Sequence, residues 1–127
     1  MKEETAKLLG KADQALRAAT ILLDAGDAET AIGRAYYTMF HTAQAVLREK
    51  DLRFRKHGSV HAAYGQHFAK TGVLDPKFHR WLLAAFNARI KTDYDIESAI
   101  DNESAARTNE QAREFLETAR RYLEGGA

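Results

Sequence analysis

Apolar residues recur along the chain at the three- and four-residue spacing that places side chains on one face of a helix. The longest such stripe runs from Ala31 to Leu47, which corresponds to several helical turns. No segment shows the alternating apolar and polar pattern of a half-buried strand. The pattern predicts five helices, over residues 2–24, 27–47, 59–71, 76–93 and 102–124.

Residues typical of helix ends lie between these stripes. Gly26 ends the first stripe and Asp27 is a suitable cap for the second helix. Ser59 is a plausible cap for the third helix, and Asp75 followed by Pro76 is typical of a helix start. Helices joined by short connections pack as antiparallel neighbours. We therefore predict an all-α protein, an up-and-down bundle of four to five helices.

Length and composition narrow the class of protein. The 127 residues fit one domain, expected to span residues 1–127, and 45% hydrophobic with 29% charged residues argue against global disorder. The absence of cysteine excludes disulfides, thiol catalysis and thiolate zinc sites. Charges near Met1 interrupt any signal-peptide core, and the longest uncharged run, residues 35–47, is too short for a bilayer. We therefore expect a cytoplasmic protein with no membrane attachment.

Charge is balanced overall but unevenly distributed. The 19 basic and 18 acidic residues give a net charge of +1, which is not the signature of broad nucleic-acid coating. Residues 48–56 are mainly basic, whereas residues 93–103 contain five acidic side chains and no basic one. These two stretches could be complementary surfaces within one molecule or between two protomers, or two solvated loops.

Metal and nucleophile motifs are incomplete in this chain. No glutamate is followed by histidine three positions later, as the metal sites of ferritin-like bundles require. His57 and His61 have the spacing of a zinc-protease pair, but Gly58 stands where the glutamate base is needed, and His61 could simply face water. No serine-nucleophile or phosphate-loop signature is present. We expect no metal and no cofactor.

Two clusters remain as candidates for chemistry. His57 stands beside Ser59 at an expected helix start, where free backbone N–H groups favour an anion, although capping alone explains the same pattern. Arg89 and Asp93 are four residues apart and can pair on one helix face. Arg34 lies among aromatic residues and would need a carboxylate or phosphate partner if buried, for which Asp93 is a candidate.

Four segments in order resemble the HEPN domain, in particular its small stand-alone prokaryotic branch. They are GRAYYTMFH at 33–41, KHGS at 56–59, GQHF at 65–68, and Arg89 through Asp95. The resemblance implies an all-helical protein that forms homodimers and is often encoded beside a minimal nucleotidyltransferase as a toxin–antitoxin-like pair. Many members of the wider family are metal-independent ribonucleases with an Arg-x4–6-His motif. Here Arg89 matches the arginine, but the histidine is missing, because Tyr94, Asp95 and Ile96 occupy its three candidate positions.

Three functional hypotheses follow from these residues. The first is a dimeric HEPN-like protein that binds a nucleotide or RNA phosphate and pairs with a nucleotidyltransferase, using Arg34, Tyr37, His57, Ser59, His67, Arg89 and Tyr94. The second is a metal-independent ribonuclease in which Arg89 stabilises charge on the phosphate and His57 or Asp93 replaces the missing histidine as catalytic base. The third is a bundle whose polar residues only stabilise a dimer.

Overall fold

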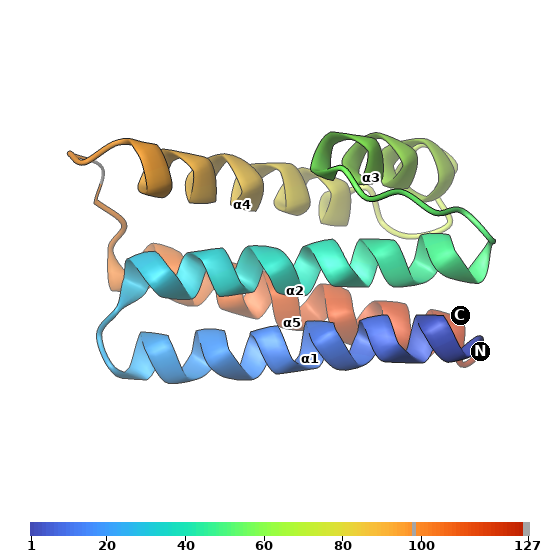
Figure 1. Cartoon of the computed structure of the whole chain (residues 1–127), viewed down its shortest axis with the longest axis horizontal. Coiled ribbons are helices and arrows are strands. Elements are labelled where there is room, and N and C mark those ends of the chain that lie inside the picture. Colours follow the sequence, from blue (N-terminus) through green and yellow to red (C-terminus); the bar gives the residue numbers. More distant parts are fainter. Residues whose placement is uncertain (98, 126–127) are drawn as a thin grey trace.

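The chain folds into helices throughout, in two groups that meet at one central helix. The computed structural model describes residues 1–97 and 99–125. Figure 1 shows α1 and α5 packed against one side of α2, and α3 and α4 lying along its other side. This confirms the predicted all-α, up-and-down bundle. The elements are α1 (Glu3–Asp24), α2 (Ala28–Glu49), α3 (His57–Tyr64), the π-helical turn η1 (Gly65–Ala69), α4 (Lys77–Tyr94) and α5 (Asn102–Leu123).

Helix α2 is central because its apolar surface is wide enough to meet neighbours on several sides. It contacts α1, α3, α4 and α5. Ala35, Tyr36, Met39, Ala43 and Val46 are all completely buried along it. Small alanines let neighbouring helices approach closely, while the larger side chains fill the space between them at the density of a protein core. Side chains at the edge of the buried face of α2 therefore lie beside a second helix.

The predicted starts of α2 and α5 are confirmed, whereas α2 runs two residues further than predicted, to Glu49. Gly26 has a φ of 84°, the left-handed conformation that glycine adopts without strain. The Asp27 carboxylate accepts a hydrogen bond of 3.2 Å from the Thr30 backbone N–H and so caps α2. Asp101 caps α5 in the same way, accepting from the N–H of Ser104 at 2.7 Å. These ends are set by local chemistry that the sequence already displays.

The predicted start of the third helix is wrong. Helix α3 begins at His57, with Lys56 at the cap position, and Ser59 is an exposed residue inside the first turn. Packing explains the earlier start. The imidazole of His57 stacks on the Phe40 ring with 4.5 Å between ring centroids and forms a hydrogen bond with Tyr36. These contacts with α2 hold the first turn in place without a capping side chain.

The third helix also changes its winding at Gly65, which the sequence pattern does not predict. The last turn, Gly65–Ala69, is π-helical. A Cβ atom on Gly65 would lie 2.6 Å from Cε1 of His79, so only glycine leaves room for that imidazole. His79 in turn donates from Nε2 to the backbone carbonyl of His61, at 3.1 Å. The turn therefore brings an imidazole from α4 against the backbone of α3.

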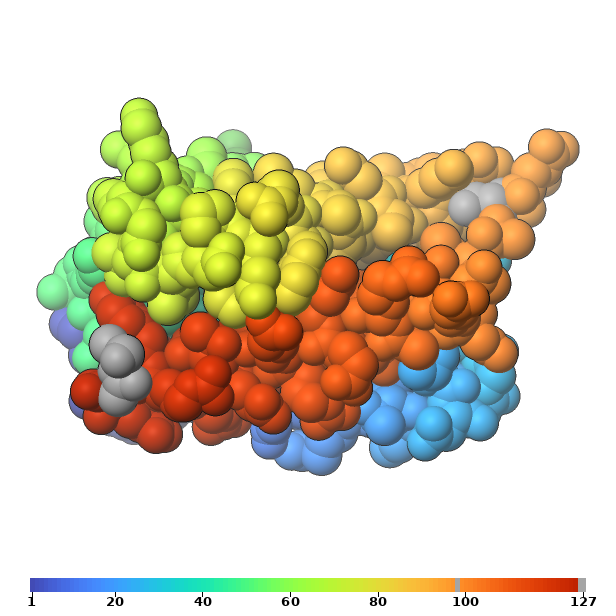
Figure 2. Space-filling view, turned by 180° about the vertical axis from the view of Figure 1, so that it is seen from behind, coloured from blue at the N-terminus to red at the C-terminus, as the bar shows by residue number. Residues whose placement is uncertain are grey.

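The two charged stretches lie at opposite ends of the bundle. Arg48 and Arg53 both pair with Glu4 of α1, beside the chain termini. The acidic stretch lies where α4 ends and α5 begins, at residues 93–97 and 99–103, and this orange part of the chain projects at the far corner in Figure 2. The two stretches are therefore not complementary surfaces within one molecule. No helix in the described part of the chain is long and apolar enough to cross a membrane.

Candidate functional site

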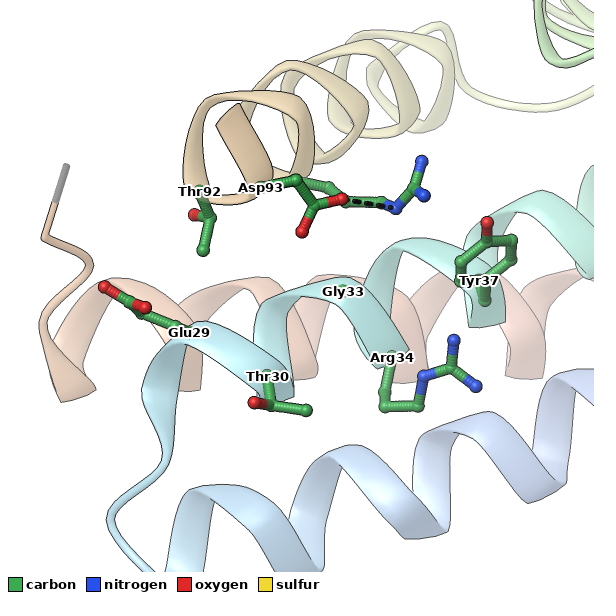
Figure 3. A pocket seen from close by; sticks show the side chains of 8 residues that line it. Glu29, Thr30, Gly33, Arg34, Tyr37, Thr92 and Asp93 are labelled. Carbon is green, nitrogen blue, oxygen red and sulfur yellow. Dashed lines mark ion pairs between the residues drawn. The ribbon is translucent and has the colours of Figure 1, made fainter. Parts of the chain in front are cut away.

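A pocket of about 400 Å³ lies between the first half of α2 and the last turns of α4. In Figure 3, Thr92 and Asp93 extend from α4 towards α2, and Glu29 and Tyr37 extend from α2 towards α4. Positions 29 and 30, 33 and 34, and 37 follow one another at helical spacing, so α2 contributes one continuous face. The pocket is lined by Glu29, Thr30, Gly33, Arg34, Tyr37, Arg89, Thr92 and Asp93.

Two arginines contact the ring of Tyr37 in this pocket. The guanidinium carbon of Arg34 lies 4.9 Å from the ring centroid, and that of Arg89 lies 5.1 Å from it. Both distances fall within the range of a cation–π contact. Arg34 is exposed, whereas the side chain of Arg89 is 25% exposed. The tyrosine therefore brings together two positive charges from different helices, despite their mutual repulsion.

Only one of the two arginines has a carboxylate partner among the described residues. Nε of Arg89 lies 3.5 Å from Oδ2 of Asp93, one turn further along α4, and the dashed line in Figure 3 marks this pair. The predicted pairing on one helix face is therefore confirmed, and the alternative in which Asp93 serves Arg34 is wrong. Arg34 forms no ion pair within the described ranges. It needs none for stability, because an exposed guanidinium remains hydrated.

A buried hydrogen-bond network lies directly beside the pocket. The hydroxyl of Tyr36 is 2.6 Å from Nδ1 of His57 and 2.8 Å from Nε2 of His61. A tyrosine hydroxyl can donate to one imidazole and accept from the other, so both nitrogens are satisfied when both rings are neutral. The alternative in which His61 faces water is wrong, because its side chain is buried in this network.

Burial keeps these groups uncharged near neutral pH. It lowers the pKa of His57, and the nearby positive charge of Arg89 lowers it further. Burial lowers the pKa of His61 to about 4, with smaller contributions from His57 and His79. Burial raises the pKa of Tyr36 well above its usual range. His57 is consequently a neutral imidazole beside an arginine-lined pocket, with the electronic state that a proton acceptor needs.

The structure brings some of the predicted site residues together and separates others. Arg34, Tyr37, Arg89 and Asp93 share the pocket. His57 does not line it but packs against it, with 5.9 Å between its ring centroid and that of Tyr37.

Three further predicted residues lie outside the pocket lining. Ser59 is exposed on α3, His67 is half-buried in η1, and Tyr94 is 81% exposed at the end of α4. Their predicted ligand contacts therefore stay predictions that require a ligand larger than the pocket.

Sequence reasoning did not select several residues that the structure places at or beside the site. Glu29, Thr30 and Thr92 line the pocket, and Tyr36 and His61 form the adjacent network. The three- and four-residue spacing from Thr30 through Arg34 to Tyr37 was a usable signal, because such residues share a helix face. Nothing local in the sequence indicates that Tyr36 meets two histidines from α3.

The two histidines with metal-ligand spacing meet a tyrosine hydroxyl in this fold. Both His57 and His61 direct a ring nitrogen at Tyr36. Across residues 1–97 and 99–125, no group of three or more histidine, cysteine, aspartate or glutamate side chains is placed to hold a metal ion. The geometry of this site is therefore that of a hydrogen-bonded aromatic network.

Fold and pocket together define a small helical-bundle domain with an arginine-lined pocket between two of its helices. Residues 5–124 match the HEPN domain, and the chain belongs to the HEPN domain family. The chain is 32% identical over 122 residues to "Putative toxin MJ0142" of Methanocaldococcus jannaschii, covering 96% of this chain and 83% of that protein. It is 33% identical over 124 residues to "UPF0332 protein glr0978" of Gloeobacter violaceus, covering 97% and 98%. "Putative toxin MJ0605" of M. jannaschii is 33% identical over 104 residues, covering 82% and 78%.

Proposed function

We propose that this chain is a HEPN subunit that binds the phosphate of a nucleotide or RNA in the pocket between α2 and α4. The observation that carries the proposal is the meeting of Arg34 and Arg89 on the ring of Tyr37. Guanidinium groups bind phosphate through two parallel N–H donors, with strong and directional hydrogen bonds. Thr30 adds an exposed side chain with a hydroxyl at the pocket wall.

We further propose that the subunit works as a homodimer in a toxin–antitoxin-like module with a nucleotidyltransferase. Two of its relatives carry the word toxin in their names, and the resemblance to stand-alone HEPN proteins implies the partner. The pocket between α2 and α4 has a volume of about 400 Å³, so an RNA strand would extend beyond it onto further surface, which a second subunit would supply. Light scattering after size exclusion tests the dimer, and a mass matching one chain contradicts it. A pull-down from the native cell tests the partner, and recovery of no nucleotidyltransferase contradicts that part.

Calorimetric titration tests the ligand. Adenosine 5′-monophosphate, guanosine 5′-monophosphate and a short single-stranded RNA are each added to the full chain. Arg89→Ala is expected to weaken binding by about 10- to 100-fold, the effect of losing a charge-assisted hydrogen bond. Arg34→Ala should weaken it less, because that side chain is more exposed. Arg17→Ala is the matched control, since Arg17 is an exposed arginine of α1 that pairs with Asp13 outside the pocket. No heat with any of the three compounds contradicts the proposal.

Metal-independent RNA cleavage is the second candidate, favoured by the neutral state of His57 beside Arg89. The burial and the neighbouring guanidinium that lower its pKa leave an imidazole able to accept the 2′-hydroxyl proton. Arg89 would stabilise the negative charge that develops on the phosphate. Asp93 is the alternative base, although it already pairs with Arg89.

Cleavage of single-stranded RNA in the presence of EDTA tests this candidate. His57→Gln should abolish cleavage if His57 is the base, and Asp93→Asn should abolish it if Asp93 is. His41→Gln is the matched control, because His41 is half-buried on α2 and bonds Gln44. Clean protein that cleaves no RNA contradicts the ribonuclease.

A further inference from the structure

Asp93 pairs with Arg89 in a way that does little for the stability of α4. Asp93 is in the last turn of the helix, which ends at Tyr94, where the partial negative charge of the helix end disfavours a carboxylate. Within an i, i+4 pair, the order with the acid nearer the helix N-terminus is the more favourable one, and here the base comes first. The position of Asp93 is therefore one that helix stability alone would not favour.

The i, i+4 ion pairs on other helices provide a comparison. Asp13 and Arg17 on α1 have the favourable order, and their atoms Oδ2 and NH1 are 2.7 Å apart. The corresponding Arg89–Asp93 distance is 3.5 Å, longer than a charge-assisted hydrogen bond and close to the 3.5 and 3.6 Å of the exposed pairs Glu3–Lys7 and Glu103–Arg107. The Asp93 side chain is 47% exposed. Asp93 is thus held loosely and can leave Arg89 without disturbing buried structure.

The charge of the pocket determines which anions can displace Asp93. The lining holds two guanidinium groups and the two carboxylates of Glu29 and Asp93, so its formal charges cancel before a ligand arrives. A phosphate diester carries one negative charge, like the carboxylate that it would replace on Arg89. A terminal phosphate monoester carries nearly two at pH 7 and above, because its second pKa is about 6. Only the monoester carries enough negative charge to replace Asp93 on Arg89 and to neutralise the unpaired Arg34 as well.

We infer that Asp93 is a specificity-determining residue that makes the pocket select terminal phosphate monoesters over internal phosphate diesters. The inference rests on the proposed phosphate-binding function and specifies its ligand class. Asp93 occupies Arg89 in the free protein and is displaced by a dianionic phosphate, which then bridges to Arg34. The ligands of this class are nucleoside monophosphates and RNA ends with a terminal phosphate.

Titration of the full chain with adenosine 5′-monophosphate and its 5′-methyl ester tests the inference. The two compounds share base and sugar, and the methyl group of the ester removes one phosphate charge. At pH 7.5 the monophosphate is expected to bind roughly tenfold more tightly than the ester, the order of one added charge-assisted contact. Lowering the pH from 7.5 to 5.5 should weaken binding of the monophosphate as its second proton is taken up, and leave binding of the ester nearly unchanged.

Asp93→Asn should reduce the ratio of the two affinities by strengthening binding of the ester, because Arg89 is then free to bind a monoanion. Asp13→Asn is the matched control, since it removes the acid of the α1 pair and should leave the ratio unchanged. Equal binding of the two compounds by the unmodified chain overturns the selectivity and leaves phosphate binding intact. Weaker binding of both compounds to Asp93→Asn also overturns it, because Asp93 would then contact the ligand. No binding of either compound overturns the proposed function and the selectivity together.

Discussion

Tyr36 and Tyr37 are consecutive residues of α2 that serve two different regions of the molecule. Tyr36 is 0% exposed, and its hydroxyl links two imidazoles of α3. Tyr37 is half-buried, and its ring meets two guanidinium groups in the open pocket. In a helix with 3.6 residues per turn, neighbouring residues point about 100° apart, so one step along the chain separates interior from pocket.

The difference between the two tyrosines shows where this protein can change at little cost. On the Tyr36 side, every polar contact compensates for burial, and a lost partner leaves a buried group unsatisfied. On the Tyr37 side, Arg34 is exposed and Asp93 is loosely held. Changes there should alter ligand binding more than folding. The predictions below test this contrast between the two sides, beginning with the largest expected effect.

Acid should destabilise the protein through the interior side. The pKa of His61 is lowered from 6.5 to about 4 in the folded chain, so the unfolded chain binds more protons between these values. The free energy of unfolding should therefore fall as the pH decreases from about 6.5 to about 4, by roughly 3 kcal/mol in total. His57 should add to the loss in the same direction, because its pKa is also lowered. Urea denaturation at a series of pH values measures the slope of the unfolding free energy against pH.

Single substitutions test whether the network of Tyr36, His57 and His61 causes the change of unfolding free energy with pH. His61→Gln should flatten the profile whatever its effect on stability at pH 7, because the titrating group is gone. His67→Gln is the matched control, because this half-buried histidine lies in η1 and has no hydrogen bond to Tyr36. An unfolding free energy that stays constant from pH 7 to pH 5 would contradict the assignment of a buried neutral network.

Removal of one hydroxyl at a time separates the two tyrosines directly. Tyr36→Phe leaves the facing nitrogens of His57 and His61 without their shared partner and should cost about 1 to 3 kcal/mol of stability. Tyr37→Phe should cost less than about 0.5 kcal/mol, because its half-buried hydroxyl forms no hydrogen bond with any described residue. Urea denaturation of both variants at pH 7 gives the comparison. Equal losses of stability in the two variants would mean that the hydrogen bonds of Tyr36 to His57 and His61 do not stabilise the fold.

Two glycines allow the smallest effect to be tested with an internal control. Gly10 on α1 and Gly33 on α2 both have space for a methyl group, with no atom within 4 Å of an added Cβ. Replacing either by alanine should raise stability by about 0.5 to 1 kcal/mol, since alanine favours helix interiors. Only Gly33 lines the pocket, so only Gly33→Ala should also weaken the binding of adenosine 5′-monophosphate. Weaker binding in both variants would place the ligand elsewhere.

Much of the helical framework could be predicted because its signals are local. The apolar spacing along α2 and the caps at Asp27 and Asp101 each act within a few residues. The start of α3 could not be predicted this way. It depends on the stacking of His57 on Phe40, a contact between residues 17 positions apart that no spacing rule describes.

The candidate site shows the same division. The pairing of Arg89 with Asp93 follows from their spacing on one helix, and the placement of Arg34 beside Tyr37 follows from theirs. That both pairs face one pocket depends on α4 packing across α2, and so does the placement of His57 behind that pocket. The sequence by itself determined the helices, their faces and their ends, because these depend on neighbours within a turn or two. Only the tertiary structure decided which faces meet, because packing acts between residues that are distant along the chain.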